Sequence, residues 1–330
     1  MPANLTPQYF DVEKKYKAAS TNEERVQWIE ELLAIIPKHK GTEKLQAMWK
    51  TKMAKLKDAA QKKGGPAKYT GHKVKKSGAG QVVIIGPPNT GKSLLLQTLS
   101  DTELSVSENA FSTHEPTPVM MNYENIKIQL VDTPPVTPEF MEDWFPDLVK
   151  GSDAVVFILD LADDNCLDFF DGILSNLMDK KIQFIDYRED FPNKLERGWS
   201  YKKTLCIGSK IDLIPDNELI DLYREELKPR FHLFPFSAFN PAEIETLRRE
   251  IFKILEIIRV YSKIPGKKTE RESPFTLPIG SNVMDMAKSV HKDFAENLKF
   301  ARIWGQHVYE GQRVNYSHIL EDEDTIELHM

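Results

Sequence analysis

The octapeptide from Gly86 to Ser93 constrains the fold of this chain more than any other stretch. It reads Gly-Pro-Pro-Asn-Thr-Gly-Lys-Ser and fits the pattern G-x-x-x-x-G-K-S/T at every fixed position. The apolar run 82–85 precedes it and the helix-forming stretch 94–99 follows it. A loop in this setting turns backbone N–H groups and the positive end of a helix toward phosphate. The sequence therefore predicts a nucleotide phosphate-binding loop in an α/β domain with a mostly parallel sheet.

The residue types within this loop suit the chemistry of phosphate binding. Gly86 and Gly91 allow the backbone to turn its N–H groups inward. Lys92 can reach the β and γ phosphates, and Ser93 can ligate Mg²⁺. The alternative is an ordinary turn between a buried strand and a helix, but such a turn would not require both a lysine at position 92 and a serine at position 93. The predicted nucleotide contacts are Gly86, Pro87, Asn89, Thr90, Gly91, Lys92 and Ser93.

Length and composition narrow the class of protein. A chain of 330 residues with 41% apolar and 28% charged residues is typical of a globular protein with two or three domains. No window approaches the ~18 uninterrupted apolar residues of a membrane span, and residues 1–7 lack the features of a signal peptide. We therefore expect a cytoplasmic protein with no membrane partner. Cys166 and Cys206 are too few for a disulfide framework, and we expect reduced packing residues.

Charge is distributed unevenly along the sequence. Residues 38–76 contain 13 lysines against Glu43 and Asp58, a local charge of +11, so the remaining residues carry −17 within a net charge of −6. A basic segment beside an acidic body is the footprint of contact with a phosphate backbone. A solvated lysine-rich helix is the alternative that charge alone leaves open.

Changes in residue pattern divide the chain into four regions. Apolar residues at helical spacing predict a helical module over residues 1–63, and glycine with lysine predicts a flexible basic linker over 64–79. Residues 80–257 carry the phosphate loop, and 258–330 form a further domain. We interpret residues 161–203, with an acidic helix and a polar stretch, as an insertion. Strands are predicted at 82–85, 119–123, 126–131, 154–160, 204–208 and 232–236, followed by a helix at 241–257.

Two short motifs downstream concern the base of the nucleotide. Residues 209–212 read Ser-Lys-Ile-Asp after a buried strand, and residues 237–238 read Ser-Ala after the next one. Both lie at the carboxyl ends of strands, where an open α/β sheet places its ligand. In this order the motifs resemble the guanine-recognition sequences of the GTPase superfamily.

This resemblance implies a task for each residue of the two motifs. Asp212 would accept hydrogen bonds from N1 and N2 of guanine, which adenine cannot offer, and Lys210 would cover the base. The backbone N–H of Ala238, next to Ser237, would meet O6. Ser209 replaces the usual Asn, and its shorter side chain is expected to weaken the tie to the phosphate loop. An ATPase remains the alternative, in which Asp212 would have no role in base selection.

The stretch Val131–Pro135 occupies the place of the GTPase motif D-x-x-G. The resemblance makes Asp132 a partner of Mg²⁺. The family's glycine donates its N–H to the γ-phosphate, whereas Pro135 has no N–H to give. Many GTPases carry at the next position a glutamine that orients the attacking water, and here it is Val136. Both departures predict slow unaided hydrolysis and the need for an auxiliary element.

Asn89 is the candidate for part of that auxiliary element. The loop resembles that of GTPases related to Obg and Era, in which an Asn at this place helps hold K⁺ against the phosphates. A monovalent cation would supply charge where it develops in the transition state, although Asn89 can also serve the turn alone. Residues 111–116 resemble the F-T-T-x-x-P stretch of Obg-like proteins, which implies that Thr113 closes on Mg²⁺, with Thr117 as the alternative. Lys92, Asn89 and Thr113 are thus the predicted catalytic residues.

The C-terminal region resembles the TGS domain, a small ubiquitin-like β-grasp. The motifs are Ala-Arg-Ile-Trp-Gly at 301–305, Tyr-Glu-Gly-Gln-Arg-Val at 309–314 and Asp-Glu-Asp at 322–324. We expect His291 to be a packed or capping residue of a helix rather than a metal ligand. The acids from Glu321 to Asp324 are expected to form a solvated turn.

The order of these regions resembles the developmentally regulated GTP-binding proteins, as does the stretch 36–46. The resemblance implies a translation-associated GTPase that uses Mg²⁺ and K⁺ and contacts the ribosome, rRNA or tRNA through residues 38–76 and the TGS domain. A stimulating protein partner is also implied. We therefore expect slow conversion of GTP to GDP and phosphate as a switch. The alternative is a nucleotide-dependent RNA- or ribosome-binding module with little or no hydrolysis.

Overall fold

The computed structural model describes residues 74–100, 115–214, 216–266 and 271–329, with a few positions between 12 and 52. The chain divides into two compact units, residues 1–71 and 72–330. In the first unit, a small cluster of buried apolar side chains contains Ile29, Leu32 and Trp49. The described positions there include helical residues, as predicted, but most of the predicted helical module and linker lies outside the described residues.

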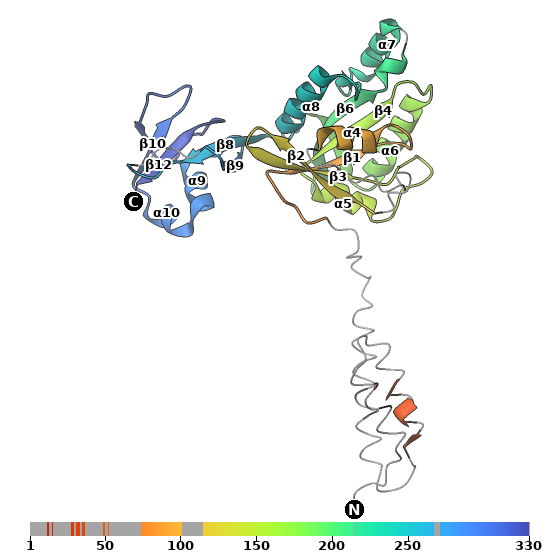
Figure 1. Cartoon of the computed structure of the whole chain (residues 1–330), viewed down its shortest axis with the longest axis horizontal. Helices are drawn as coiled ribbons and strands as arrows, with labels where there is room; N and C mark the ends of the chain where they lie inside the picture. Colours follow the sequence, from red (N-terminus) through yellow and green to blue (C-terminus); the bar gives the residue numbers. More distant parts are fainter. Residues whose placement is uncertain are drawn as a thin grey trace, which may run out of the picture. The chain divides into compact units, whose positions relative to one another are not determined.

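The second unit begins with a seven-stranded sheet (Figure 1). The strand order is β2-β3-β1-β4-β6-β5, with β7 also paired to β6. Only the pairing of β2 with β3 is antiparallel, so the sheet is mostly parallel, as predicted. The elements are β1 (Gln81–Ile85), α4 (Lys92–Leu99), β2 (Thr117–Tyr123), β3 (Ile126–Asp132), α5 (Phe145–Gly151), β4 (Ala154–Asp160), α6 (Cys166–Asp179), β5 (Ile182–Asp186), β6 (Ser200–Ser209), the 3₁₀ turn η1 (Ile211–Leu213), α7 (Asn217–Leu227), β7 (Leu233–Pro235) and α8 (Pro241–Lys253).

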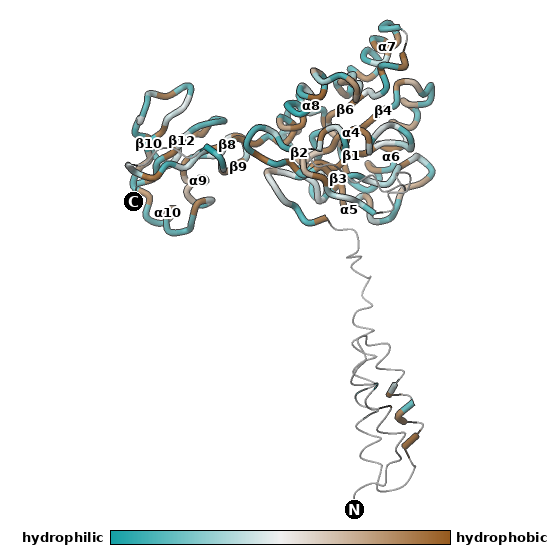
Figure 2. The backbone as a smooth tube through the Cα atoms, viewed as in Figure 1, coloured by the Kyte–Doolittle hydropathy of each residue, from teal (hydrophilic) through white to brown (hydrophobic). Residues whose placement is uncertain are grey.

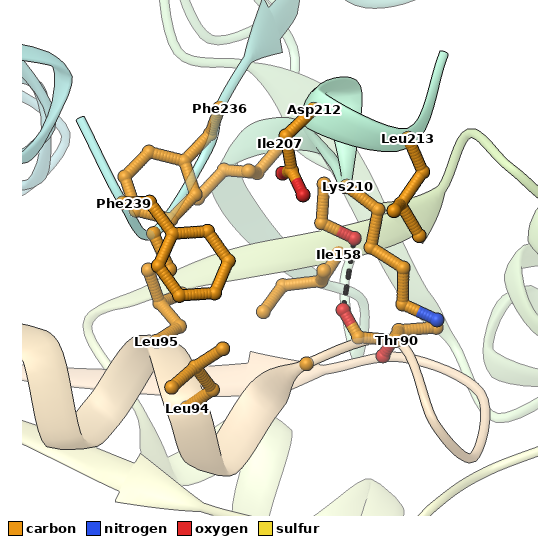
Figure 3. A pocket seen from close by; sticks show the side chains of 13 residues that line it. Thr90, Leu94, Leu95, Ile158, Ile207, Lys210, Asp212, Leu213, Phe236 and Phe239 are labelled. Atoms are coloured by element: carbon orange, nitrogen blue, oxygen red, sulfur yellow. Dashed lines mark hydrogen bonds between the residues drawn. The ribbon is translucent and has the colours of Figure 1, made fainter.

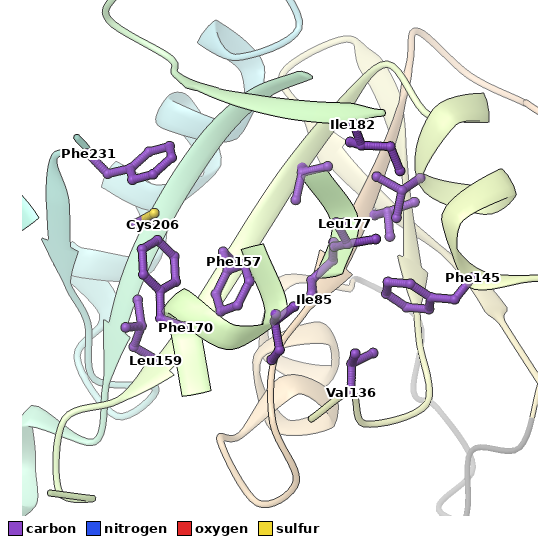
Figure 4. Packing of buried hydrophobic residues seen from close by; sticks show 14 of the residues in the cluster. Ile85, Val136, Phe145, Phe157, Leu159, Phe170, Leu177, Ile182, Cys206 and Phe231 are labelled. Atoms are coloured by element: carbon purple, nitrogen blue, oxygen red, sulfur yellow. The ribbon is translucent and has the colours of Figure 1, made fainter. Parts of the chain in front are cut away.

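Helices cover both faces of this sheet because its central strands are apolar on both sides. All five residues of β1 are buried, and Figure 2 shows the apolar colouring concentrated along the strands. Val83 and Ile85 belong to the cluster that α5 and α6 complete (Figure 4). Val82 and Ile84 belong to the opposite cluster with α4 and α8. A strand buried on both faces is characteristic of parallel sheets.

The carboxyl ends of the parallel strands bring the predicted site residues to one edge. The phosphate loop follows β1, Asp132 ends β3, Asp160 ends β4 and Ser209 ends β6. Register pairs Asp160 with Ser209 directly across β4 and β6. This edge is where open α/β sheets bind their ligands.

The stretch 161–203 contains regular elements of the sheet, so its interpretation as an insertion was wrong. The acidic helix is α6, and it leads into β5, which pairs in parallel with the first half of β6. Residues 187–199 alone connect β5 to β6. The stretch therefore completes an ordinary strand–helix–strand unit.

A second sheet of five strands forms the C-terminal part of the unit. Its order is β11-β10-β12-β8-β9, and only β12 and β8 are parallel. Helix α9 begins with a reciprocal cap between Asn282 and Asp285, and it buries Val283 and Met286 against the sheet. The elements are β8 (Ile257–Ser262), β9 (Phe275–Pro278), α9 (Val283–Val290), α10 (Lys292–Asn297), β10 (Phe300–Trp304), β11 (Gln312–Val314) and β12 (Thr325–His329).

Three smaller expectations can be compared with these elements. His291 caps α10, because its Nδ1 accepts a hydrogen bond from Asp293 N at 3.2 Å, which confirms the capping role. Cys166 and Cys206 are buried free thiols, and burial raises the pKa of both. The acids at 321–324 are not simply a solvated turn, because Asp324 is buried and Asp322 binds Arg259. Among the described residues, no helix is both long and apolar enough to cross a membrane.

Replacing Phe157 with alanine should lower the free energy of unfolding by about 3–5 kcal/mol. The ring is fully buried and packs edge-on against Phe170, with 4.7 Å between centroids. Urea unfolding followed by tryptophan fluorescence measures the change. Leu222→Ala on α7 is the control, because Leu222 is exposed, and its cost should stay within about 0.5 kcal/mol. Equal costs for the two variants would contradict this assignment of the core.

Candidate functional site

The phosphate loop adopts a conformation that depends on its glycines. Gly91 precedes α4 with φ of 89°, and Asn89 has φ of 62°, a region that Asn tolerates better than most residues. A Cβ added to Gly86 would lie 2.7 Å from the carbonyl oxygen of Ile158, so the loop passes too close to β4 for any side chain. Thr90 Oγ1 closes the turn by donating to the carbonyl of Pro87 at 3.0 Å. The sequence pattern is thus explained by local geometry.

Lys92 is held inside the loop by the loop's own carbonyls. Its Nζ donates to Gly86 O at 2.9 Å and to Pro87 O at 2.6 Å. Burial lowers the pKa of Lys92 from 10.5 to about 8, against an opposing contribution from Asp132. An ammonium group surrounded by carbonyls at a helix start favours an arriving anion, which would also raise this pKa again.

Ser93 and Asp132 bring two oxygen donors together at the start of α4. Ser93 Oγ donates to Asp132 Oδ2 at 3.2 Å. Thr133 follows with its hydroxyl bonded to Ile84 O at 2.6 Å, which fixes the chain directly after β3 to β1. Hydroxyl and carboxylate oxygens are the ligands that Mg²⁺ prefers, so the donor set fits that ion.

A cavity of about 270 Å³ opens beside the loop and is lined by the residues predicted to bind the base (Figure 3). Thr90 and Gly91 of the phosphate loop line this cavity. Lys210, Asp212 and Ala238 of the two downstream motifs line it as well. Ser237 does not line the cavity itself, but its Oγ donates to Asp212 Oδ1 at 2.9 Å and so orients that carboxylate. Motifs more than 100 residues apart therefore converge on one hollow.

Ser209 connects the base cavity to the phosphate loop. Its Oγ lies 2.8 Å from the carbonyl oxygen of Thr90 and 2.9 Å from that of Leu159. One hydroxyl proton serves two acceptors, whereas an amide would offer two protons. The serine side chain therefore still connects this strand end to the phosphate loop, although it offers one hydrogen-bond donor fewer than an asparagine would.

Several residues of the site were not predicted from the sequence. The Phe239 ring lies at the mouth of the cavity and is 76% exposed; Figure 3 shows it across the hollow from Lys210. Asp160 holds Lys210 Nζ at 2.5 Å, and Glu243 accepts from Ser237 N at 2.7 Å. The aromatic residue directly after Ser237-Ala238 was the one available signal, because an exposed ring can stack on a base.

Pro135 and Val136 differ from the catalytic residues of many GTPases in position as well as in type. Val136 is buried in the core cluster with Phe145 and Val149, and its N–H donates to Gly86 O at 3.3 Å. Its side chain is therefore unavailable to orient a water molecule. Thr113 lies outside the described residues, while Thr117, the alternative, begins β2 directly opposite Asp132.

The phosphate loop, the oxygen donors and the base cavity define a P-loop nucleotide-binding protein of the GTPase class. Residues 81–190 match the family model described as 50S ribosome-binding GTPase, and residues 258–330 match the model described as TGS domain. Over most of its length the chain is similar to the developmentally regulated GTP-binding proteins, and it combines a GTPase domain with a C-terminal TGS domain as matched by the two models. The resemblance seen in the sequence is thereby confirmed.

Individual relatives are distant but match along most of the chain. An uncharacterized GTP-binding protein of Methanocaldococcus jannaschii is 27% identical, with 92% of each chain covered. Developmentally-regulated GTP-binding protein 1 of Xenopus laevis is 25% identical over 92% of this chain and 98% of its own length. The structure of the Schizosaccharomyces pombe YchF GTPase shares the fold, with a TM-score of 0.52 at 13% identity, covering 77% of this chain and 99% of that one.

GTP affinity should fall as the pH rises above about 8. Burial holds the pKa of Lys92 near 8 in the free protein, whereas bound phosphate favours the ammonium form, so binding takes up a proton above that pH. Below pH 7.5 or so the affinity should be constant, and above 8 each pH unit should weaken it up to about tenfold. Titration with fluorescent GTP from pH 7 to 9 measures the effect.

Guanosine monophosphate is the control for this pH series. It has the same base but lacks the β and γ phosphates that Lys92 is placed to reach. The GTP-to-GMP affinity ratio should therefore fall above pH 8. A ratio that stays constant from pH 7 to 9 would contradict the assigned protonation of Lys92.

Proposed function

We propose that the protein binds GTP in the cavity beside the phosphate loop and hydrolyses it slowly, as a switch that acts with the ribosome or RNA. The observation that carries the proposal is that Thr90 and Gly91 of the phosphate loop line one cavity together with Asp212 and Ala238. Selection of guanine follows from Asp212, whose carboxylate only accepts hydrogen bonds and therefore matches the N1 and N2 donors of that base. Phe239 and Lys210 would cover the two faces of the base.

Mg²⁺ would be held by Ser93 and Asp132, with Thr113 proposed as a further ligand. The ion would neutralise charge on the β and γ phosphates. Asp132 is 92% buried and is the last residue of β3, so its carboxylate is positioned by the sheet rather than by a loop. The protein's own part is to fix these oxygens and, through Lys92, to place one positive charge beside the phosphates.

Slow hydrolysis is proposed because two groups that usually act on the γ-phosphate side are missing. Pro135 cannot donate, and Val136 is committed to the core. We propose that K⁺ held near Asn89 supplies charge in their place. Asn89 is exposed, and its amide makes no side-chain hydrogen bond to the part of the chain that the structure describes, so it can serve such a role.

The proposed partner is the ribosome or structured RNA, with a protein partner as a further stimulus. The local charge of +11 over residues 38–76 supports contact with a phosphate backbone. The TGS domain is proposed as a second contact. The matched family description, 50S ribosome-binding GTPase, points to the same class of partner.

A nucleotide-dependent binding module with little hydrolysis is the second candidate. The burial of Val136 favours it, because no described side chain takes the place of the glutamine that orients water. The two candidates agree on the nucleotide and the partner. They differ only in whether the bond to the γ-phosphate is cleaved at a useful rate.

Asp212→Asn should lower GTP affinity on the order of 100-fold or more, because the amide nitrogen would face the N1 and N2 donors of guanine. ATP binding should not change. Competition between labelled GTP and each nucleotide measures both affinities. Glu218→Gln, on the exposed start of α7, is the charge-matched control. Equal competition by ATP and GTP in the wild type would contradict selection of guanine.

Single-turnover cleavage of GTP should be at least about tenfold faster in K⁺ than in Na⁺, and faster again with ribosomal particles. Asn89→Ala should remove the difference between the two cations but leave GTP affinity within about threefold. Radiolabelled phosphate release measures the rate. A rate that stays at the uncatalysed level under every condition would exclude the hydrolase and leave the binding module.

A further inference from the structure

The C-terminal sheet has a second face, opposite the one that packs against α9. In β10, Ala301 and Ile303 belong to the buried cluster that α9 completes. Side chains alternate along a strand, so the residues between them project to the other side of the sheet. We call that side the outer face of the TGS domain. The same alternation in β11, in β12 and at the end of β8 gives its members as Lys263, Phe300, Arg302, Trp304, Arg313, Glu327 and His329.

Three planar groups of the outer face come from three neighbouring strands and contact one another. The Phe300 ring stacks on the His329 ring, with 4.5 Å between centroids and 10° between planes. The Arg313 guanidinium lies 4.1 Å from the centre of the same Phe300 ring. Phe300 lies in β10, between His329 of β12 and Arg313 of β11. The guanidinium is therefore positioned by a cation–π contact, so a ligand that binds it has less side-chain motion to restrict.

The outer face carries more positive than negative charge. Its one carboxylate, Glu327, is buried and already paired, at 3.3 Å from Lys263 Nζ and 2.7 Å from His329 Nε2. Arg302 and Arg313 are exposed, lie directly opposite each other on β10 and β11, and form no ion pair within the described part of the chain. Like charges opposite each other destabilise a sheet, so an anion bound beside both would offset a cost that the free protein carries.

Exposed tyrosines flank the strand at the edge of this face. Strand β11 is outermost in the strand order, and Tyr309 precedes it while Tyr316 follows it. Their side chains are 86% and 58% exposed. An exposed aromatic ring is a surface on which a nucleic-acid base can stack, and cations beside such rings contact the phosphates. Bases within a double helix are already stacked on one another, so this combination fits unpaired nucleotides.

We propose that the outer face and its edge strand β11 bind single-stranded RNA, with Arg302 and Arg313 at the phosphates and Tyr309 and Tyr316 stacked on unpaired bases. The inference rests on the proposed action with the ribosome or RNA, and it adds which surface recognises which form of RNA. The basic segment 38–76 supplies charge, which attracts the phosphates of single-stranded and double-stranded RNA alike. The outer face would direct the protein to loops and strand ends, where bases are free to stack.

The first test compares two forms of one RNA on the full chain. A labelled strand of about 12 nucleotides is titrated alone and annealed to its complement, and fluorescence anisotropy gives both affinities. In the double variant Tyr309→Ala/Tyr316→Ala, the ratio of single-strand to duplex affinity should fall about tenfold or more, because only free bases can stack on the rings. Phe140→Ala is the control, because Phe140 is an exposed ring of the other sheet domain, and the ratio should stay within about twofold.

The second test measures the salt dependence of single-strand binding. Removing both phosphate contacts with Arg302→Gln/Arg313→Gln should reduce the slope of log affinity against log salt concentration by about 1.4. Lys288→Gln/Lys292→Gln is the matched control, because it removes two exposed positive charges from α9 and α10 on the helix side of the same domain. That slope should stay within about 0.3 of the wild-type value.

The outcomes separate this inference from the proposed function. Equal loss of single-strand and duplex binding in the tyrosine variant, or an unchanged ratio, would overturn the single-strand surface and leave the basic segment as the RNA contact. Unchanged RNA binding with loss of binding to ribosomal particles would assign the face to a protein instead and also overturn it. A wild-type chain that binds neither form of RNA would overturn the RNA partner of the proposed function together with this surface. Failure to bind GTP would overturn the nucleotide site alone.

Discussion

The hydroxyl of Ser209 is the contact on which the two halves of the nucleotide site depend. It reaches carbonyl oxygens of Thr90 in the phosphate loop and Leu159 in β4, so the ends of β1, β4 and β6 keep a fixed spacing. The phosphate loop by itself could bind the phosphates of any nucleotide. Asp212 by itself is an exposed acidic side chain with no phosphate site beside it. Because Ser209 precedes Lys210 directly, the same turn that binds the loop also sets the position of the side chains proposed to recognise the base.

Much of the fold and site was predictable because short motifs specify the backbone around them. The glycines of 86–93 require a tight loop, and the all-apolar β1 requires cover on both faces, which fixes the α/β class. Carboxyl ends of parallel strands meet at one edge, so the convergence of Asp132, Lys210 and Asp212 follows from strand order. The bounds of the predicted domains and the chemical roles of these residues stay predictions.

What the sequence did not reveal depends on partners far along the chain. Strand β5 is short, lies outermost in the strand order and mixes polar with apolar residues, so its pattern resembles a loop. The acids near residue 322 resemble a solvated turn because Arg259, which binds them, lies 63 positions earlier. The burial of Val136 could not be predicted for the same reason, because it results from the packing of α5 against this side chain.

The departures at Pro135 and Val136 affect the packing beside the phosphate loop as well as the proposed chemistry. Pro135 lacks the N–H by which many GTPases contact the γ-phosphate, and Val136 is packed with Phe145 while its own N–H donates to Gly86 O. The departures therefore remove one proposed γ-phosphate contact without opening space beside the phosphate loop, because Val136 fills its position from within the core. The residues proposed to contact the base and the loop's own phosphate-binding groups belong to other elements, so these two departures bear on the γ-phosphate side of the proposed site alone.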